Sequence, residues 1–449
     1  MKAAFLIAAP ASGSGKTTVA RGLMALLRQQ GFCVQPFKCG PDYIDTKFHE
    51  QVCGRPSVNL DTFMASTQHV QELFVRYTSD ADVAVVEGMM GLFDGYDRDR
   101  GSCSEVARVL GLQIVLVVDA RSAAYSMAAL LQGFLRFRQD LCFAGVIFNK
   151  VGSPRHQQML REVAAEVGLP CLGCIPKQSS LEQGSRYLGL DFSEETNTEG
   201  LVRVLAENVD LPMLLASATC GSTSCHQPPS SAPSPASPSS AISPTSPRRI
   251  LVARNAESFS FVYAETLDTL RQFGDIDFFD PEKDELLMKN DELFLYLPGG
   301  YPEKHLEALV CAEATRRFVR SFAEADGRII AECGGMMYLC RSILTDDGEF
   351  PMCGVLPYSV SARRADRRLS LGYRRFQLDG HELRGHEFHY TQFAAPTPDS
   401  AVQVYNAKGE PVATQILRRG NVLASYTHLS SEAIVAVVGD WPLMPMPTL

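Results

Sequence analysis

The segment AAFLIAAPASGSGKTTVARGL (residues 3–23) reads as a strand, a loop and a helix in succession. Its apolar run predicts a buried strand over residues 3–9, and the pattern that follows predicts a helix over residues 16–30. Glycines between the two let backbone N–H groups close around phosphate, where the start of a helix adds partial positive charge. The predicted nucleotide-binding residues are Ser12, Gly13, Ser14, Gly15, Lys16, Thr17 and Thr18.

Lys16 and Thr17 give this loop its chemistry, because a lysine here reaches the outer phosphates and a threonine hydroxyl can bind Mg²⁺. The loop departs from the strict phosphate-loop pattern at Pro10, where that pattern has a glycine. A Gly/Ser turn that merely begins a helix would leave the lysine unexplained. We therefore interpret the segment as a variant P-loop.

The same alternation of short apolar runs and helical patterns continues along the chain. Further strands are predicted at residues 33–37, 83–86, 114–118 and 144–148, and again at 250–253, 275–279, 293–297 and 328–331. Each run is rich in Val, Ile or Leu and bounded by Gly, Asp or Asn, which is typical of buried parallel strands. The predicted fold class is α/β, with a doubly wound P-loop domain followed by a second α/β domain.

The segment CHQPPSSAPSPASPSSAISPTSPRR (residues 225–249) separates the two sets of strands. It is rich in Pro, Ser and Ala, and no acidic or basic residue stands between Asp210 and Arg248. Such a segment has little to bury and predicts an extended linker. We expect a first domain over residues 1–210, a linker over 211–248 and a second domain over 249–449.

Composition and charge exclude some classes of protein. The chain has 449 residues, a net charge of −9 and no basic tract, so we expect no nucleic-acid partner. It has no run of eighteen apolar residues, so we expect no membrane partner. Thirteen scattered cysteines, an odd number in a long chain, favour a reducing compartment, and we expect a cytoplasmic protein.

Acidic and amide side chains follow several predicted strands of the first half. Asp45 stands in a turn at residues 36–50, Glu87 ends an apolar strand, and Asp94 lies in the Gly-rich loop after it. Ligands bind at this end of the strands in open α/β sheets, so Glu87 is predicted to be a metal-binding or catalytic residue. For Asp45, a solvated acidic turn is as plausible as a role in binding a metal or substrate. Asn149 follows another strand, where its amide either recognises a nucleotide base or caps a turn.

The pair Cys171 and Cys174 has the spacing of half a zinc site. No second pair of metal-binding residues stands nearby, so we do not predict a metal. The surrounding sequence GLPCLGCIP reads as a strand, on which the two side chains should point to opposite faces.

The segment RIIAECGGMMYLC (residues 328–340) places Cys333 between a strand and a helix. Small residues around it allow the strained turn of a nucleophile elbow, and the helix start favours the thiolate. The oxyanion hole is predicted from the backbone N–H of Gly334 and one N–H of the Gly299–Gly300 turn. Candidate bases are His386, His389 and His428, of which His428 follows an apolar strand and could face the elbow.

Together these motifs resemble the cobyrinic acid a,c-diamide synthase family, a group of ATP- and glutamine-dependent amidoligases of the corrin pathway. The resemblance rests on motifs that span the chain outside the linker: SGSGKTT, PFKCGPDYIDTKFH, NLDTFM, VVEGMMGLFDGYD, LPGGYPE, AECGGMMYL, LGYRRF, RGHEFHY and ASYTHL. It implies a dethiobiotin-synthetase-like P-loop domain joined to a class I glutaminase domain. The implied partners are a tetrapyrrole carboxylate, glutamine and ATP with Mg²⁺, and a homodimer is an open alternative for the assembly.

The resemblance also implies roles for single residues. Cys333 is the implied glutaminase nucleophile and His428 its base, while Asp45, Glu87 and Asp94 match acids of the synthetase site. Thr17, Asp45 and Glu87 are the implied Mg²⁺ ligands. The chain departs from the family at Arg254-Asn255, where Lys-Asp is usual, at Tyr187, where histidine is usual, and at Ser430, where many class I glutaminases have Glu.

The resemblance leaves the substrate open. The expected substrate is cobyrinate, with hydrogenobyrinate and nickel-sirohydrochlorin as alternatives. A distant alternative is a P-loop switch ATPase, which would have no need of a fused glutaminase.

Overall fold

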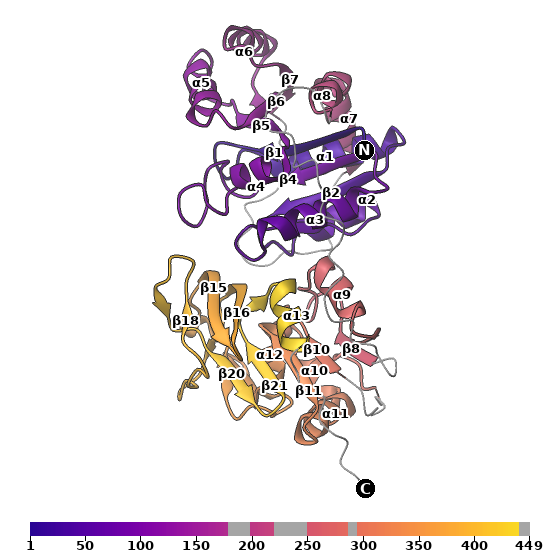
Figure 1. The fold of residues 1–449 in the computed structure, drawn as a ribbon, viewed down its shortest axis with the longest axis vertical. Coiled ribbons are helices and arrows are strands. Elements are labelled where there is room, and N and C mark those ends of the chain that lie inside the picture. Colours follow the sequence, from indigo (N-terminus) through magenta and orange to yellow (C-terminus); the bar gives the residue numbers. More distant parts are fainter. Residues whose placement is uncertain (178–197, 220–248, 286–293, 440–449) are drawn as a thin grey trace. The chain divides into compact units, whose positions relative to one another are not determined.

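The computed structural model describes residues 1–177, 198–219, 249–285 and 294–439. The chain divides into two compact units, one made of Met1–Thr62 and Ser66–Pro235 and the other of Phe63–Ala65 and Ala236–Leu449 (Figure 1). We call them the first and the second unit. Residues 220–248 of the expected linker (residues 211–248) and Tyr187 lie outside the described residues.

The first unit is built on a seven-stranded sheet in the order β3-β2-β4-β1-β5-β6-β7. Every neighbouring pair in it is parallel, as predicted for this half of the chain. Strands β1 and β4 lie inside the sheet and are buried along their whole length, which explains their unbroken apolar sequences. The strands are β1 (Ala3–Ala8), β2 (Val34–Cys39), β3 (Val58–Leu60), β4 (Val83–Glu87), β5 (Gln113–Asp119), β6 (Cys142–Val151) and β7 (Cys171–Pro176).

Eight described helices join these strands. Helix α1 (Lys16–Gln29) begins directly after the Gly/Ser-rich loop, as predicted, and packs ten buried residues between the sheet and its neighbours. The others are α2 (Asp45–Cys53), α3 (Thr67–Thr78), α4 (Cys103–Leu110), α5 (Met127–Phe137), α6 (Pro154–Glu166), α7 (Thr198–Asn208) and α8 (Leu211–Ser217). None of the helices in the described part of the chain is long and apolar enough to cross a membrane.

Helix α8 corrects the expected start of the linker at residue 211. Asp210 accepts a hydrogen bond from the N–H of Met213 and so caps the helix, while Leu214 and Ala218 are buried in the core of the first unit. The short sequence LPMLLA carries enough apolar surface to pack against that core, which its lack of charged residues concealed. The packed part of the first unit therefore extends to Thr219, which forms a β-bridge with Ala3.

The second unit has a six-stranded sheet in the order β20-β21-β11-β10-β8-β9. Its pairs are parallel except for β20, which runs antiparallel along one edge. The four strands predicted in this half are β8 (Arg249–Ala253), β9 (Asp275–Phe279), β10 (Phe294–Leu297) and β11 (Arg328–Glu332), joined by β20 (Ile416–Arg419) and β21 (Val422–Ser425). The described helices here are α9 (Ala264–Arg271), α10 (Leu306–Cys311), α11 (Glu313–Glu324), α12 (Gly334–Leu339) and α13 (Ser431–Gly439), with short 3₁₀ turns η2 (Pro302–Lys304) and η3 (Arg364–Asp366).

Two smaller sheets of the second unit were not predicted, and one of them carries the candidate base. The four-stranded sheet contains β12 (Ser342–Thr345), β13 (Gly348–Pro351), β14 (Ser359–Ser361) and β17 (Gln392–Phe393). The five-stranded sheet contains β15 (Ser370–Leu378), β16 (His381–His389), β18 (Val404–Tyr405), β19 (Pro411–Val412) and β22 (His428–Leu429). In it, His428 pairs with His386 on the neighbouring strand.

The expected orientation of Cys171 and Cys174 is wrong. Their Sγ atoms lie 3.8 Å apart, so the two side chains meet instead of pointing to opposite faces. The cause is a shift in the pairing of β6 with β7, where Val146 pairs with Cys171 but the next residue pairs with Gly173. An extra residue in one strand reverses the alternation of side chains beyond it.

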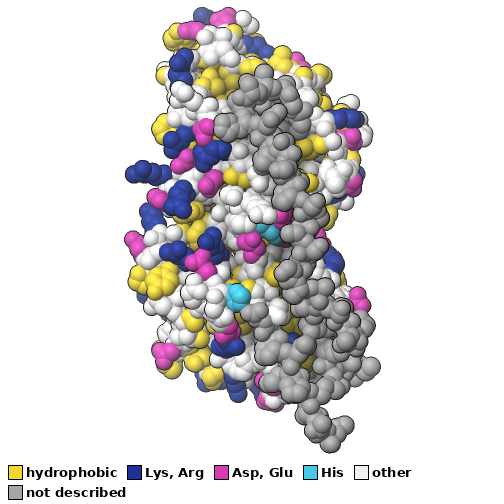
Figure 2. All heavy atoms as spheres, in the orientation of Figure 1, with side chains coloured by type: hydrophobic (Ala, Val, Ile, Leu, Met, Phe, Trp, Pro, Cys, Tyr) yellow, Lys and Arg dark blue, Asp and Glu magenta, His cyan; other side chains and the backbone are white. Residues whose placement is uncertain are grey.

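The charges on the surface are mixed. On the face that Figure 2 shows, Lys and Arg side chains lie among Asp and Glu side chains instead of forming one large field of a single sign.

Candidate functional site

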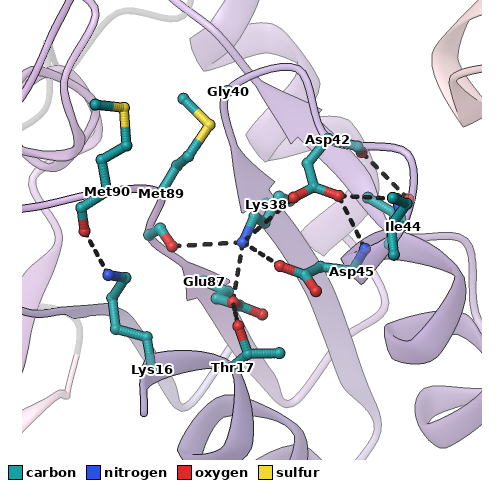
Figure 3. A network of polar contacts seen from close by, with 12 residues as sticks. Lys16, Thr17, Lys38, Gly40, Asp42, Ile44, Asp45, Glu87, Met89 and Met90 are labelled. Atoms are coloured by element: carbon teal, nitrogen blue, oxygen red, sulfur yellow. Dashed lines mark hydrogen bonds and ion pairs between the residues drawn. The ribbon is translucent and has the colours of Figure 1, made fainter. Parts of the chain in front are cut away.

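The loop between β1 and α1 has the backbone that phosphate binding requires. Gly13 and Gly15 have φ angles of 79° and 97°, which side chains with a Cβ rarely adopt. A Cβ on Gly15 would lie 2.2 Å from the side-chain nitrogen of Asn149, so only glycine fits there. The Nζ of Lys16 donates to the backbone carbonyl of Met90 (Figure 3). Burial lowers the pKa of Lys16.

Lys38 is the centre of a buried ionic network beside this loop (Figure 3). Its Nζ lies 2.7 Å from Asp45 Oδ2, 2.9 Å from Glu87 Oε1 and 3.9 Å from Asp42 Oδ2. Burial disfavours the charge on Lys38, but Asp45 and Glu87 outweigh burial and raise its pKa well above the ordinary value. The network therefore holds a permanent cation between two of the predicted acids.

Glu87 connects this network to the phosphate loop. Its Oε1 accepts a hydrogen bond of 2.5 Å from the hydroxyl of Thr17, the second residue of α1. Its Oε2 lies 2.7 Å from His49 Nε2, and His49 Nδ1 lies 3.1 Å from the hydroxyl of Ser57. Burial and Asp45 oppose the charge on Glu87, but Lys38 and His49 outweigh them and lower its pKa. The structure thus brings Thr17, Asp45 and Glu87 into one network, and their role as Mg²⁺ ligands stays a prediction.

Asp94 and Asn149 lie outside this ionic network. Asp94 Oδ2 accepts a hydrogen bond of 3.0 Å from the N–H of Gly91 and so closes the loop after β4. Asn149 donates to the carbonyl of Ser14 at 2.9 Å and accepts from the N–H of Lys150. In this structure the amide of Asn149 therefore holds the phosphate loop, and recognition of a base by it stays a prediction.

Sequence reasoning missed Lys38 and His49. Both belong to the stretch PFKCGPDYIDTKFHE, of which only the acids were weighed. A signal was present in Lys38, because a lysine inside an apolar parallel strand is almost never buried without an acidic partner. His49 gave no such signal, since only the packing of α2 on the sheet brings it to Glu87.

The second unit holds Cys333 on a sharp turn between β11 and α12. Its φ and ψ angles are 47° and −108°, a strained conformation for a residue with a side chain, and its N–H donates to the carbonyl of Ser425 at 2.7 Å. A Cβ on Gly335 would lie 2.1 Å from the carbonyl oxygen of Leu297, so the helix can start this close to β10 only with glycine. These are the features of the predicted nucleophile elbow.

Three of the predicted residues meet around the thiol. A Cβ on Gly299 would lie 3.1 Å from the Cβ of Cys333 and 2.4 Å from Cε1 and 3.2 Å from Nε2 of His428. The imidazole of His428 therefore lies beside the nucleophile, with Cε1 and Nε2 near position 299. A Cβ on Gly334 would lie 2.9 Å from the N of Gly300, so the two predicted oxyanion donors are neighbours as well.

The other two candidate bases are engaged elsewhere. His389 stacks on Tyr426 with ring centroids 3.6 Å apart, and its Nδ1 lies 2.8 Å from the carbonyl of Thr391. His386 is buried beside His428, and burial together with that neighbour lowers its pKa to about 3. Of the three histidines, His428 is the one positioned to act on Cys333.

The thiol of Cys333 is protonated in this state. Burial raises its pKa, and Glu303 adds to the rise. The expectation that the start of α12 favours the thiolate is therefore outweighed by burial, and a base must take the proton before this thiol can act as a nucleophile.

Three of the residues that depart from the family pattern have structural partners. The amide of Asn255 donates to Ser258, Asp280 and Glu282, and Arg254 lies over the ring of Phe278. The hydroxyl of Ser430 accepts from the N–H of Ala433 and starts α13.

Comparison with known proteins agrees with these two sites. Residues 5–189 match the CobQ/CobB/MinD/ParA nucleotide binding domain, and residues 249–433 match the CobB/CobQ-like glutamine amidotransferase domain. Hydrogenobyrinate a,c-diamide synthase of Brucella abortus biovar 1 is 39% identical over 434 residues, which cover 95% of this chain and 98% of the relative. The enzyme of the same name from Mycobacterium bovis is 37% identical over 456 residues, which cover 97% and 96%.

Similarity to solved structures is weak. The match to chloroplast FtsY from Physcomitrella patens covers 40% of this chain and 60% of the FtsY chain, with a TM-score of 0.31 and 20% identity. A glutamine amidotransferase from Thermotoga maritima covers 40% of this chain and 75% of its own at a TM-score of 0.29 and 18% identity.

Proposed function

Because the chain belongs to the family of the hydrogenobyrinate a,c-diamide synthases, we propose that it uses glutamine and ATP to convert two peripheral carboxylates of a corrin-type macrocycle into amides. The observation that carries this proposal is the pair of sites in one chain. One combines a phosphate loop with buried Lys38, Asp45 and Glu87, and the other combines Cys333 with His428. The first suits activation of a carboxylate by ATP, and the second suits release of ammonia from glutamine.

The macrocycle is the finer part of the proposal. The names of the relatives favour hydrogenobyrinate, the metal-free macrocycle, over cobyrinate. The two differ at the centre of the ring, far from the carboxylates that react. We propose hydrogenobyrinate as the substrate and cobyrinate as the second candidate.

Release of ammonia proceeds through a thioester. His428 Nε2 takes the thiol proton as Cys333 Sγ attacks the side-chain amide carbon of glutamine. The N–H groups of Gly334 and of the Gly299–Gly300 turn donate to the oxyanion of the tetrahedral intermediate. His428 then gives the proton to the departing ammonia, and water hydrolyses the thioester to glutamate.

Activation of the macrocycle proceeds through an acyl phosphate. A carboxylate oxygen of the macrocycle attacks the γ-phosphorus of ATP, and ADP leaves. Lys16, Lys38 and the N–H groups of residues 13–18 neutralise the charge that spreads over the phosphate oxygens. Ammonia then attacks the acyl carbon, phosphate leaves with the C–O bonding pair and takes up one proton from the nitrogen, and the neutral amide remains. Repetition at the second carboxylate completes the reaction.

The donor set of the first site fits Mg²⁺. Thr17 Oγ1 and Glu87 Oε1 lie 2.5 Å apart beside the phosphate loop, and Mg²⁺ in ATP sites takes one or two such oxygens together with phosphate oxygens and water. Thr17, Glu87 and Asp45 are the residues that would hold it. When bound, the ion neutralises charge on the phosphates. Among the described residues, no group of three or more His, Cys, Asp and Glu side chains could hold a metal ion.

Replacement of Cys333 by alanine tests the proposed division of labour. The variant should lose amidation supported by glutamine, because no thioester can form, and keep amidation supported by high free ammonia at alkaline pH. Amide formation on the macrocycle is measured with each nitrogen source. Loss of both activities in a folded variant would contradict the proposal that the two sites act in separate steps.

A further inference from the structure

Glu332 is a buried acid that the proposed mechanism has not used. It is the last residue of β11 and directly precedes Cys333, and its side chain is 3% exposed. Burying a carboxylate costs free energy unless the carboxylate has partners, so its position calls for a reason.

Two hydrogen bonds fix this carboxylate. Tyr296 on β10 donates its hydroxyl to Glu332 Oε2 at 2.8 Å, and the N–H of Leu429 on β22 donates to Oε1 at 3.1 Å. Leu429 follows the candidate base in the chain. The carboxylate is therefore held by β10 on one side and by β22, the strand of His428, on the other.

The fixed carboxylate faces the Nδ1 side of the base. Glu332 Oε2 lies 3.7 Å from His428 Nδ1, while Cε1 and Nε2 of the ring approach position 299, which also adjoins the Cβ of Cys333. Thiol, imidazole and carboxylate thus follow one another in the order that cysteine and serine hydrolases use. Catalytic hydrogen bonds are often long before substrate binds, so 3.7 Å is within the reach of this role.

We propose that Glu332 is the positioning residue of the glutaminase site. Its carboxylate holds the proton of His428 on Nδ1, which leaves Nε2 free to accept the thiol proton, and stabilises the imidazolium that follows. The proposal rests on the glutaminase half of the proposed function. It places the third member of the triad immediately before the nucleophile, while Ser430, two residues after the base, caps α13.

The other titratable groups around the base come from two elements. Cys333 lies beside the ring near position 299, and His386 of β16 pairs with His428 across the five-stranded sheet. Burial and His428 keep His386 uncharged at neutral pH, with Arg374 acting in the same direction and Glu387 against it. Among the ion pairs between described residues, Glu332 is therefore the acid that lies within 4.0 Å of His428.

The test uses the full chain with Glu332→Gln, which has nearly the same shape without the charge. Glutaminase kcat should fall about 10⁴-fold, as expected for loss of the third group of such a triad, with KM changed less than about threefold. The acid limb of the pH profile of kcat/KM should move to lower pH, because the protonated ring loses its anionic neighbour. Ammonia-supported amidation should be unchanged.

Tyr296→Phe separates positioning from structure, because it removes one hydrogen bond of Glu332 and keeps the charge. Its kcat should fall much less than that of Glu332→Gln. Equal losses in the two variants with an unmoved acid limb would show that Glu332 only ties β11 to its neighbours and would overturn the proposal. If Glu332→Gln does not fold, Glu332→Asp decides, since the retracted carboxylate should lower kcat about tenfold and an unchanged kcat would overturn the role.

Wild-type protein distinguishes this inference from the proposed function. A wild-type chain without glutaminase activity would overturn the proposed function and this role together. A wild-type chain with that activity, beside a fully active Glu332→Gln variant, would overturn the role alone.

Discussion

The thiol of Cys333 and the imidazole of His428 meet where the chain has no side chain at position 299. A Cβ at Gly299 would overlap Cε1 of His428 at 2.4 Å and press on the Cβ of Cys333 at 3.1 Å. Contacts under 3.0 Å force one partner to move. The nearer partner here is the ring that has to accept the proton.

Gly299→Ala should therefore reduce glutaminase activity about 100-fold by displacing His428, since small displacements of catalytic groups have effects of this size. Glutaminase kcat is the measurement, with ammonia-supported amidation as the internal reference. The matched control is Gly439→Ala, because a Cβ at Gly439 meets nothing within 4 Å. Equal glutaminase activity in both variants would show that His428 is not held beside Cys333.

Lys38 stabilises the first unit as well as serving its site. Removing it would leave Asp45 and Glu87 buried without their cation, and breaking a buried pair from one side costs about 3–5 kcal/mol. Lys38→Met should lower the free energy of unfolding of the first unit by about this amount and abolish amidation. Chemical denaturation measures the first effect.

Lys2→Met is the control for Lys38→Met. Lys2 also pairs with an acid of the first unit, Asp82, but its side chain is 69% exposed and such pairs contribute less than about 1 kcal/mol. Similar losses of stability in the two variants would contradict the account of the buried network.

The residues that the sequence identified are those whose chemistry is local. Short sequence patterns indicate a function directly. They include the glycines around Lys16 and Cys333 and the acid at the end of β4. His49 and Glu332 have partners that are distant in sequence, 38 residues away for His49 and Glu87 and 97 residues away for Glu332 and Leu429. No spacing in the sequence encodes such contacts.

At the scale of elements, β16 carries two titratable groups in opposite states. His386 is buried and uncharged, with its pKa lowered to about 3 by burial and by His428. Glu387 is buried and charged, because hydrogen bonding to His389 and the charge of Arg374 outweigh burial and lower its pKa to about 2. Both states make the second unit sensitive to acid.

Through both groups, the free energy of unfolding decreases as the pH falls. Below its ordinary pKa of 6.5, His386 takes up a proton only when unfolded, so its effect leaves stability intact above about pH 6.5 and reduces it as pH falls toward about 3. The stability that Glu387 contributes is present above about pH 4.5 and is lost as pH falls through about 2. Between about pH 6.5 and 4.5 only the histidine of this pair acts.

His386→Phe should therefore flatten the pH dependence of stability in that window. The phenylalanine keeps a ring against Tyr373 and takes up no proton. At about pH 5 the wild type should lose about 2 kcal/mol relative to about pH 7 through this histidine, and the variant should not. Urea denaturation at the two pH values measures it, and parallel losses in both proteins would contradict the assignment.

Elements could be predicted where burial requires an apolar sequence. Most of the parallel strands of both units are apolar runs, although β2 and β9 also carry polar or charged residues, and all of those predicted were found. Apart from β15 and β16, which have nine residues each, the strands of the two smaller sheets are two to four residues long and too short for any periodicity to show. The orientation of Cys171 and Cys174 failed for another reason, because an irregular pairing of two strands cannot be read from either strand alone.

At the scale of the whole molecule, two chemistries that need each other are carried by separate compact units. Amide formation at the first site requires ammonia as well as an activated carboxylate. The ammonia released at the cysteine site is productive only if the first site consumes it. A switch ATPase would need the first site alone. The resemblance read from the motifs and the similarity over 95% of the chain agree on the combination.

Mass spectrometry of the macrocycle tests the central claim most directly. Hydrogenobyrinate and cobyrinate are incubated separately with the protein, ATP, Mg²⁺ and glutamine, and product masses are recorded over time. The account predicts that two carboxylates become two amides, through a species with one, and that ADP and glutamate form in step with them. ATP hydrolysis that proceeds without any amide on either macrocycle would contradict it.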